Sequence, residues 1–458
     1  MYLLYSALAA LALLLSSPVW LLRMMRHGKY RAGLGERIGR VPARLLDPAQ
    51  RPTIWVHAVS VGEVLAVSGL ISELQPRLPS YRIVISTTTM TGQTLARDRF
   101  GEANVFYFPV DFAFAVRPYL RALHPALVII AETEFWPNFL RLARQSGARV
   151  AVVNARISDR SFPRYRRFCS LVSPVLHEVD LFLAQGDEDC RRLIEIGAPP
   201  ERVQVSGNLK FDLKPPAESP LVAQLQSALA NVRNLEGAPH LPGLGGSFPV
   251  LVCGSTVEGE EELLLRAFDL VRKDYPPALM ILAPRHPERF AQVAVLVAAS
   301  GVRSWRRSQW NGIEAPQGGV FLLDSIGELA SMYALADIAF VGGSLVPKGG
   351  HNILEAAQHG AAIVVGRHTE NFRDMVALFR RADAVVVASA DELAPTFLKL
   401  LADENRRRYL GARAHEILRA NSGATARTLA ALESLLAEQA AAATARAAAS
   451  KISQRMET

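Results

Sequence analysis

The chain has 458 residues, and 51 lysines and arginines against 43 aspartates and glutamates give a net charge of +8 at pH 7. Half of its residues are hydrophobic, which excludes an intrinsically disordered protein and leaves room for two or three domains. A basic surface suits nucleic acid, anionic lipid or phosphorylated substrates. The three cysteines show neither metal-binding spacing nor a pairing pattern, which favours a reducing compartment.

The first 22 residues carry no charged side chain, and a segment dense in arginine follows from Arg23 to Arg44. About 20 apolar residues are enough to span a bilayer as a helix, and positive charge directly after the span favours the cytoplasmic side. A cleaved signal peptide has the opposite order of charge. The pattern therefore predicts an uncleaved membrane-anchor helix over residues 1–22, with the rest of the chain cytoplasmic. A merely buried amphipathic helix is the alternative.

Short apolar segments alternate with helical patterns over residues 23–211 and again over residues 248–425. Strands that are apolar throughout and alternate with helices indicate a parallel sheet covered on both faces. The fold class is therefore α/β, with two doubly wound, Rossmann-like domains facing a cleft. Residues 212–247 are rich in proline and glycine, which predicts a linker with an irregular insert. Residues 426–458 are expected to form a terminal helix and tail.

Polar residues of the first domain stand where its apolar segments end. Ser60, Gly62 and Glu63 form a strand–loop–helix turn, in which Glu63 could simply be an acid at a helix start. Glu132 and Glu134 follow a buried strand two residues apart, a spacing that could serve acid–base chemistry. They could equally bind neighbouring backbone N–H groups and hold a loop. Parallel strands place their carboxyl ends at one edge, so these groups are expected beside the cleft.

The second domain shows the same arrangement. Ser255 and Thr256 follow its first strand and could donate to an anion or cap the next helix. Arg285 and His286 follow the next strand, where an arginine suits phosphate or carboxylate recognition or a surface ion pair. Lys210, at the junction of the domains, could reach a charged ligand across the cleft.

A glycine-rich segment, "KGGHNILEAAQHGAAIVVG" at residues 348–366, indicates a loop, a short helix and a buried strand. Gly349 and Gly350 allow close backbone approach, and His351 and Asn352 are predicted to begin the helix, where free N–H groups can hold a phosphate. Glu355 lies on the same helix face as His351 and could accept ribose hydroxyls. Alternatively, the glycines only form turns and Asn352 only caps the helix.

Ten motifs run in order from residue 35 to residue 357: "GERIGR", "WVHAVSVGE", "STTTMTGQTLA", "YFPVD", "ETEFWPN", "VNARISDRSF", "GNLKFD", "GSTVEGEE", "APRHPERF" and "GGHNILEAA". Together they resemble the 3-deoxy-D-manno-octulosonic acid (Kdo) transferases of Gram-negative lipopolysaccharide synthesis, which are inverting glycosyltransferases of the GT-B fold. The resemblance implies a CMP-Kdo donor, a lipid A precursor as acceptor and a location at the cell inner membrane.

The resemblance also assigns roles to residues. Glu36 in "GERIGR" matches the proposed catalytic base of the family, although its spacing alone reads as an ion-pair partner. Arg285 and Lys210 match residues near the phosphate and carboxylate of the donor. The "GGHN" segment with Glu355 matches the nucleotide region. The family often has proline where this chain has Ile353 and Ala356.

The expected partners are the donor, the acceptor and anionic lipid of the inner membrane. No DxD-type motif stands at a strand end, so neither a metal ion nor a cofactor is expected. The basic charge gathers beside the apolar segment and no RNA-binding aromatic signature is present, so nucleic acid is not expected. Two alternatives remain: a lipid-modifying GT-B enzyme that uses a UDP-sugar, of the lipid-disaccharide synthase type, and a non-catalytic membrane-anchored nucleotide-binding protein.

Overall fold

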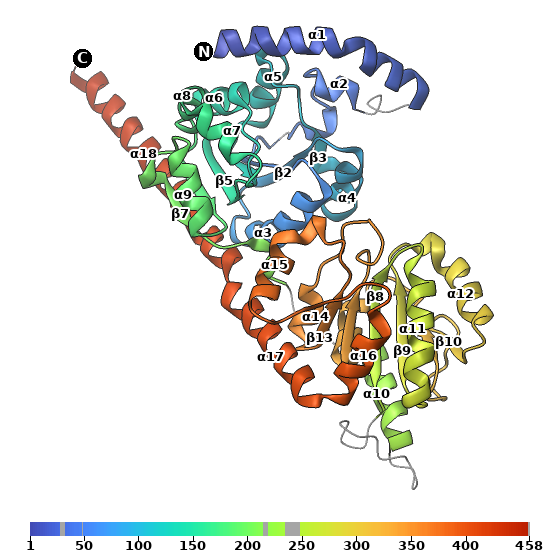
Figure 1. Cartoon of the computed structure of the whole chain (residues 1–458). Coiled ribbons are helices and arrows are strands. Elements are labelled where there is room, and N and C mark those ends of the chain that lie inside the picture. Colours follow the sequence, from blue (N-terminus) through green and yellow to red (C-terminus); the bar gives the residue numbers. More distant parts are fainter. Residues whose placement is uncertain (28–32, 48, 214–218, 234–247, 457–458) are drawn as a thin grey trace. The chain divides into compact units, whose positions relative to one another are not determined.

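The computed structural model describes residues 1–27, 33–47, 49–213, 219–233 and 248–456. The chain forms two compact units (Figure 1). The first unit comprises Met1–Asp212 and Asn421–Thr458, and the second comprises Leu213–Ala420. Each unit is described by itself below.

The first unit contains a seven-stranded sheet in which every strand pairing is parallel, in the order β3-β2-β1-β4-β5-β6-β7. Its strands are β1 (Thr53–His57), β2 (Arg82–Thr87), β3 (Val105–Tyr107), β4 (Pro125–Ala131), β5 (Arg149–Ala155), β6 (Leu181–Ala184) and β7 (Val203–Val205). Its helices are α1 (Tyr2–His27), α2 (Leu34–Arg37), α3 (Val61–Arg77), α4 (Met90–Phe100), α5 (Ala113–Leu123), α6 (Pro137–Gln145), α7 (Phe162–Arg167), α8 (Cys169–Leu176), α9 (Asp187–Glu195) and α18 (Ala424–Met456).

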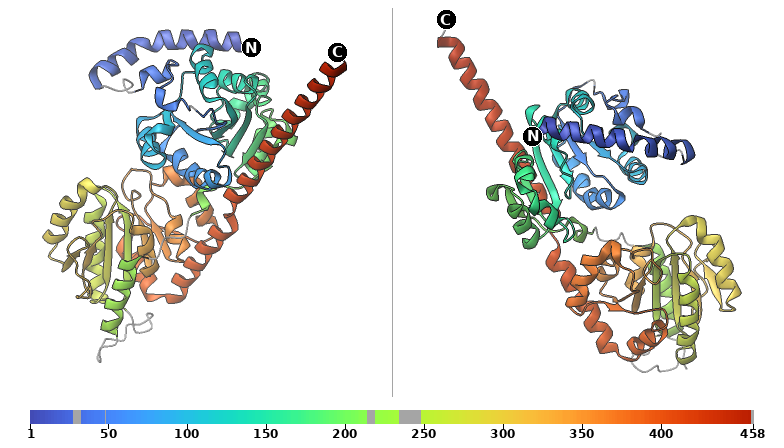
Figure 2. Two further views of the ribbon diagram at one scale, coloured as in Figure 1. Left: turned by 180° about the vertical axis from the view of Figure 1, so that it is seen from behind. Right: turned by 45° about the horizontal axis from the view of Figure 1, so that its top comes forward.

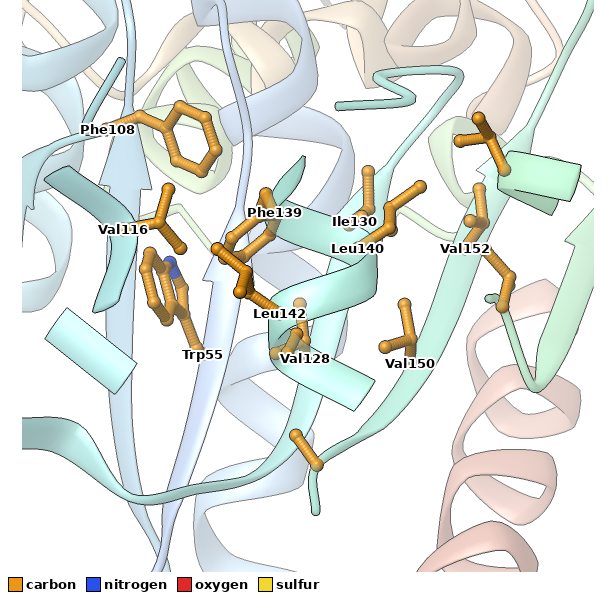
Figure 3. Close-up of a cluster of buried hydrophobic side chains, with 14 of the residues drawn as sticks. Trp55, Phe108, Val116, Val128, Ile130, Phe139, Leu140, Leu142, Val150 and Val152 are labelled. Atoms are coloured by element: carbon orange, nitrogen blue, oxygen red, sulfur yellow. The ribbon is translucent and has the colours of Figure 1, made fainter. Parts of the chain in front are cut away.

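The side chains of this sheet alternate between two buried clusters, as the period of a strand requires. One cluster joins Trp55, Val128 and Val150 to helices α5, α6, α8 and α9 (Figure 3). The other joins their neighbours Ile54 and Leu127 to helices α3, α4 and α18. Because both faces are covered, the strands must be apolar throughout, which is the pattern seen in the sequence.

The last helix belongs to the first unit, although the chain reaches it only after passing through the second. α18 runs along the first unit (Figure 2), and Leu429 and Leu432 are buried in the cluster shared with α3. The carboxylate of Asp212 accepts hydrogen bonds from the backbone N–H groups of Gly423, at 2.6 Å, and Thr425. This contact joins the point where the chain leaves the first unit to the point where it returns. No local sequence pattern predicts this return.

The second unit repeats the architecture, with a parallel sheet in the order β10-β11-β9-β8-β12-β13-β14. Its strands are β8 (Val250–Thr256), β9 (Leu279–Pro284), β10 (Ser304–Arg306), β11 (Val320–Leu322), β12 (Ile338–Val341), β13 (Ala362–Val365) and β14 (Val386–Val387). Its helices are α10 (Pro220–Arg233), α11 (Glu260–Asp274), α12 (Phe290–Ala299), α13 (Leu329–Met332), α14 (Leu354–Gln358), α15 (Arg373–Arg381), α16 (Leu393–Ala402) and most of α17 (Glu404–Asn421). The predicted α/β class with two doubly wound parallel sheets is confirmed.

Part of the segment expected to be irregular is helical. α10 lies within residues 212–247, and its apolar side chains Leu221, Leu225 and Leu229 recur every fourth residue and are buried. That spacing places them on one face of a helix, so burial outweighs the nearby prolines. Residues 214–218 and 234–247 of the expected linker lie outside the described residues.

The apolar amino-terminal segment forms α1, which lies against α6. The Tyr2 hydroxyl donates to the Glu178 carboxylate at 2.8 Å, and the Asn138 amide donates to the Ser6 hydroxyl at 3.0 Å. No helix among the described residues is both long and apolar enough to cross a membrane. The predicted single-pass anchor over residues 1–22 is therefore not supported. Residues 28–32 of the basic segment lie outside the described part of the chain.

Trp55 offers a test of the first core. Its buried ring lies 4.8 Å from the ring of Phe139 and 5.3 Å from that of Phe106, and its indole N–H donates to Ser86. Trp55→Ala is expected to lower the free energy of unfolding by about 3–5 kcal/mol, because it leaves a cavity and removes the hydrogen bond from the indole to Ser86. Urea denaturation followed by circular dichroism measures this change. The control Phe114→Ala, in a ring that is 64% exposed, should change it by less than about 0.5 kcal/mol; equal losses would contradict the assignment of the core.

Candidate active site

Glu63 lies at the start of α3, at the carboxyl end of the first sheet. Its carboxylate accepts hydrogen bonds from the backbone N–H of Val59 at 2.7 Å and from the Ser60 hydroxyl at 2.9 Å. Ser60 is the N-cap residue of α3 and accepts from the Glu63 N–H at 3.5 Å, so the two side chains cap the helix start together, in the manner of a capping box. Burial raises the pKa of Glu63 to about 7, and the nearby charges of Glu132 and Glu134 contribute to the rise. Glu63 thus both caps the helix and titrates near neutral pH.

Two further carboxylates and one ammonium group gather near Glu63. The Lys210 Nζ atom lies 3.2 Å from a carboxylate oxygen of Glu132. Burial, followed by the charge of Glu132, raises the pKa of Glu134. The structure therefore brings Glu63, Glu132, Glu134 and Lys210 together within the first unit. Gly62 stands beside them in the first turn of α3, where an added Cβ would meet only the Ser60 hydroxyl, at 3.9 Å.

An amide network beside these carboxylates was not singled out in the sequence. Asn154, at the end of β5, is buried with φ 53°, and its Oδ1 accepts a hydrogen bond from the Leu209 N–H at 3.0 Å. The Asn208 amide donates to Gln185 at 2.9 Å, and its oxygen accepts from the Lys210 N–H at 3.0 Å. This network fixes the backbone that carries Lys210. The sequence signal was the "VNAR" that ends the strand, because asparagine tolerates a positive φ.

Glu36 lies in α2, beside the end of β3. One carboxylate oxygen forms an ion pair with Arg44 at 2.6 Å, and the other accepts a hydrogen bond from the Tyr107 N–H at 2.7 Å. Its side chain is 14% exposed. The ion pair expected from spacing is present, and it holds the carboxylate in one orientation. Within the described residues, no hydrogen bond or ion pair joins Glu36 to Glu63, Glu132 or Glu134.

In the second unit, the two polar residues that end β8 differ in availability. Ser255 has φ 55° and is partly exposed. Thr256 is buried, and its hydroxyl donates to the Glu261 carboxylate at 3.0 Å. The backbone oxygen of Thr256 accepts from the N–H of Arg285 at 2.9 Å. Thr256 therefore supports the turn that follows β9, and Ser255 is the more accessible hydroxyl.

The glycine-rich segment differs from its predicted form. α14 begins at Leu354 and has five residues, so the expectation that it begins at His351 and Asn352 is wrong. Gly349 and Gly350 have φ values of 87° and 76°, which prolong the loop. The N–H of Gly350 donates to the Gly343 oxygen at 2.7 Å, and Asn352 accepts from the Leu354 N–H at 3.1 Å.

Four of the predicted residues nevertheless come together here. Burial lowers the pKa of His351 to about 4, and the positive charges of Arg285 and His286 add to the effect. Burial also raises the pKa of Glu355, and the charge of Arg285 opposes that rise. At neutral pH His351 is thus uncharged, and Arg285 supplies positive charge. Such a site can hold an anion beside hydroxyl-accepting groups.

Two doubly wound parallel sheets with polar side chains at their carboxyl ends define a class of α/β proteins that bind ligands at that end of the sheet. Among the described residues, no three His, Cys, Asp or Glu side chains are arranged to hold a metal ion.

Comparison with known proteins identifies the family within this class. A family model described as 3-deoxy-D-manno-octulosonic-acid transferase matches residues 32–213. The transferase of that name from Haemophilus influenzae is 34% identical over 408 residues, covering 88% of this chain and 92% of that protein. The Bordetella pertussis transferase is 36% identical over 431 residues, covering 91% and 96%. The chain belongs to the Kdo transferase family of glycosyltransferases, which confirms the resemblance.

The crystal structure of the C-terminal CMP-Kdo binding domain of WaaA from Acinetobacter baumannii is also similar. It is 34% identical and covers 43% of this chain and 98% of that domain, with a TM-score of 0.37.

The pKa of Glu63 predicts a pH dependence of stability. Because the pKa rises from 4.5 to about 7 on folding, the folded chain binds more protons between these pH values. The free energy of unfolding therefore falls as pH rises through this window, by up to roughly 3 kcal/mol. Glu63→Gln should remove this contribution, whereas Glu73→Gln, in a side chain that is 45% exposed, should not. Urea denaturation across the window tests this; identical pH slopes in the wild type and Glu63→Gln would refute it.

Proposed function

We propose that the chain transfers Kdo from CMP-Kdo to a lipid A precursor, with inversion at the anomeric carbon. Family membership supports the transferred sugar. An anionic nucleotide donor is favoured by one cluster at the carboxyl end of the second sheet, which contains Arg285, His286, His351 and Glu355. The two units are proposed to act as a GT-B pair, with the acceptor at the first and the donor at the second.

At the donor, the charged groups act on the leaving CMP. Arg285 provides a guanidinium that can pair with phosphate or with the Kdo carboxylate. His351, uncharged at neutral pH, can exchange hydrogen bonds with the donor, and Glu355 can accept from ribose hydroxyls. A fixed cation favours the bond-breaking transition state, because negative charge grows on the phosphate as the glycosidic bond breaks. This chemistry uses no metal ion.

At the acceptor, Glu36 is proposed to remove the proton of the attacking hydroxyl. Arg44 and the Tyr107 N–H each bond one of its oxygens, and each oxygen keeps a further lone pair for the substrate. This arrangement fixes the orientation that general-base catalysis requires. Glu63 is the alternative base, because a pKa of about 7 matches the operating pH. Glu132 and Glu134 complete the proposed acceptor site.

The lipid acceptor is proposed to be met at the cytoplasmic face of the inner membrane. α1 binds the first unit through Tyr2 and Ser6. The opposite side of this helix presents exposed leucines: Leu3, Leu4, Leu8, Leu11 and Leu15. An apolar helix face beside basic residues suits contact with the surface of an anionic bilayer.

A transfer assay tests the reaction and its base. Purified protein with CMP-Kdo, a lipid A precursor and EDTA should give products heavier by whole Kdo units in mass spectrometry. Glu36→Gln should lower kcat by about 10²–10⁴, because the base is lost, whereas Glu73→Gln should leave it unchanged. Loss in Glu63→Gln but not in Glu36→Gln would move the base to Glu63. No added Kdo from folded wild type would refute the transferase proposal, and activity lost only with EDTA would refute metal independence.

Donor binding tests the second unit separately. Isothermal titration calorimetry should show CMP binding more tightly than UDP. Arg285→Ala should raise the Kd for CMP by at least about tenfold, because an ion pair with phosphate is lost. Arg266→Ala is the control, since that side chain is 72% exposed on α11. Preference for UDP would favour a UDP-sugar enzyme, and equal Kd values for wild type and Arg285→Ala would remove Arg285 from the donor site.

A further inference from the structure

Glu260, the first residue of α11, has a carboxylate that serves a distant loop. Its side chain is fully buried. It accepts hydrogen bonds from the backbone N–H groups of Val257 at 3.1 Å, Gly343 at 2.7 Å, Ser344 at 2.9 Å and Leu345 at 2.8 Å. Three of these donors belong to the loop after β12, more than 80 residues away. The carboxylate therefore occupies the place that an anionic ligand takes in an anion-binding loop.

This loop sets the position of His351. The oxygen of Gly343 accepts from the N–H of Gly350 at 2.7 Å. A Cβ atom at Gly343 would lie 2.8 Å from two atoms of the His351 ring, so the ring lies directly against this glycine. A displacement of Gly343 would therefore move both the His351 ring and the backbone just before it.

Glu261, the next residue, serves a second loop. Its side chain is 1% exposed and binds Arg289 with two hydrogen bonds, at 2.6 Å and 3.1 Å. The backbone N–H of Arg289 donates to the backbone oxygen of His286 at 3.0 Å. Glu261 also accepts from Thr256, whose backbone oxygen holds the N–H of Arg285. One carboxylate thus fixes both ends of the turn that carries Arg285 and His286.

The three acids in the first turn of α11 differ in burial and in the groups that they bind. An acid there is ordinarily explained by the helix dipole, and Glu262 fits that explanation, with a side chain 62% exposed and 4.0 Å from Arg266. The dipole does not explain why Glu260 and Glu261 are buried and bound to other segments.

We propose that Glu260 and Glu261 are positioning residues for the donor site. Glu260 sets His351, and Glu261 sets Arg285 and His286. The identity of the ligand, a CMP-sugar, rests on the proposed function.

The test compares Glu260→Gln and Glu261→Gln with Glu262→Gln, which removes the same charge from the same turn. In Glu260→Gln an amide NH₂ faces N–H groups that need an acceptor, so the loop should loosen. Amide hydrogen exchange at residues 343–345 and 350 should accelerate in this variant only. The Kd for CMP and the KM for CMP-Kdo should rise by at least about tenfold in both buried variants. The KM for the acceptor, and every value for Glu262→Gln, should stay within about twofold of wild type.

A merely structural role would lower the melting temperature of both buried variants and leave the Kd for CMP unchanged, and that outcome overturns the proposal. If Glu261→Gln does not fold, Arg289→Gln breaks the same contact from the less buried side and should raise the same Kd. Unchanged exchange at residues 343–345 in Glu260→Gln also overturns it. Wild type that binds no CMP would refute the proposed function, and accelerated exchange in Glu260→Gln would then support only the contact between Glu260 and the loop.

Discussion

The loops and helix starts that follow the strands contain backbone N–H groups that have no partner in the sheet or helix. Buried carboxylates of the chain itself accept hydrogen bonds from these groups. Glu63 accepts from Val59 before α3, and Glu260 accepts from the loop after β12. Asp111 accepts from the N–H groups of Asn138 and Phe139, at 3.0 Å and 2.7 Å, where α6 begins. A buried N–H without a partner costs as much as a lost hydrogen bond. The carboxyl ends of both sheets therefore depend on these acids.

The buried carboxylate of Glu260 also bears on the proposed donor site of the second unit. The loop after β12 offers N–H groups that would otherwise suit a phosphate, but Glu260 already accepts from Gly343, Ser344 and Leu345. These three N–H groups are therefore not free to bind an anionic ligand, and in the proposed donor site Arg285 supplies positive charge that acts on both His351 and Glu355. A site built on a guanidinium discriminates by the geometry of its fork as well as by charge. In this proposal Glu260 acts on the site through the loop that it holds.

Local patterns predicted the strands but not the long-range contacts. Continuous apolar runs such as residues 127–131 can only be covered on both faces, so the parallel sheets were predictable. The return of α18 depends on Asp212 and Gly423, which are 211 residues apart, and no local signal marks such a pair. The acids at the start of α11 were also visible in the sequence. Their partners were not, because the loop bound by Glu260 lies more than 80 residues later.

The error at α14 has a local cause. Asn352 was expected to begin the helix and does bond the Leu354 N–H, but Gly349 and Gly350 both adopt positive φ and extend the loop. Two left-handed glycines in succession direct the backbone toward Gly343 and Asn371, whose contacts then fix where the helix can start. Sequence patterns identify glycine as permissive without showing which conformation tertiary contacts select.

Backbone strain marks the same ends of the sheets. Glu132, Asn154 and Ser255 have φ values of 58°, 53° and 55° at the ends of β4, β5 and β8. Among the other left-handed non-glycine residues of the described chain, His124 and Asp383 follow helices α5 and α15, where this conformation is common, and Gln50 lies in a turn. At a strand end it costs about 1–3 kcal/mol and persists only where surrounding contacts enforce it. Those contacts are present: Glu132 is held by Lys210, and Asn154 by Leu209. The strained residues therefore lie at the strand ends where both sheets present polar groups. Contacts that enforce such strain also hold those polar groups in fixed positions.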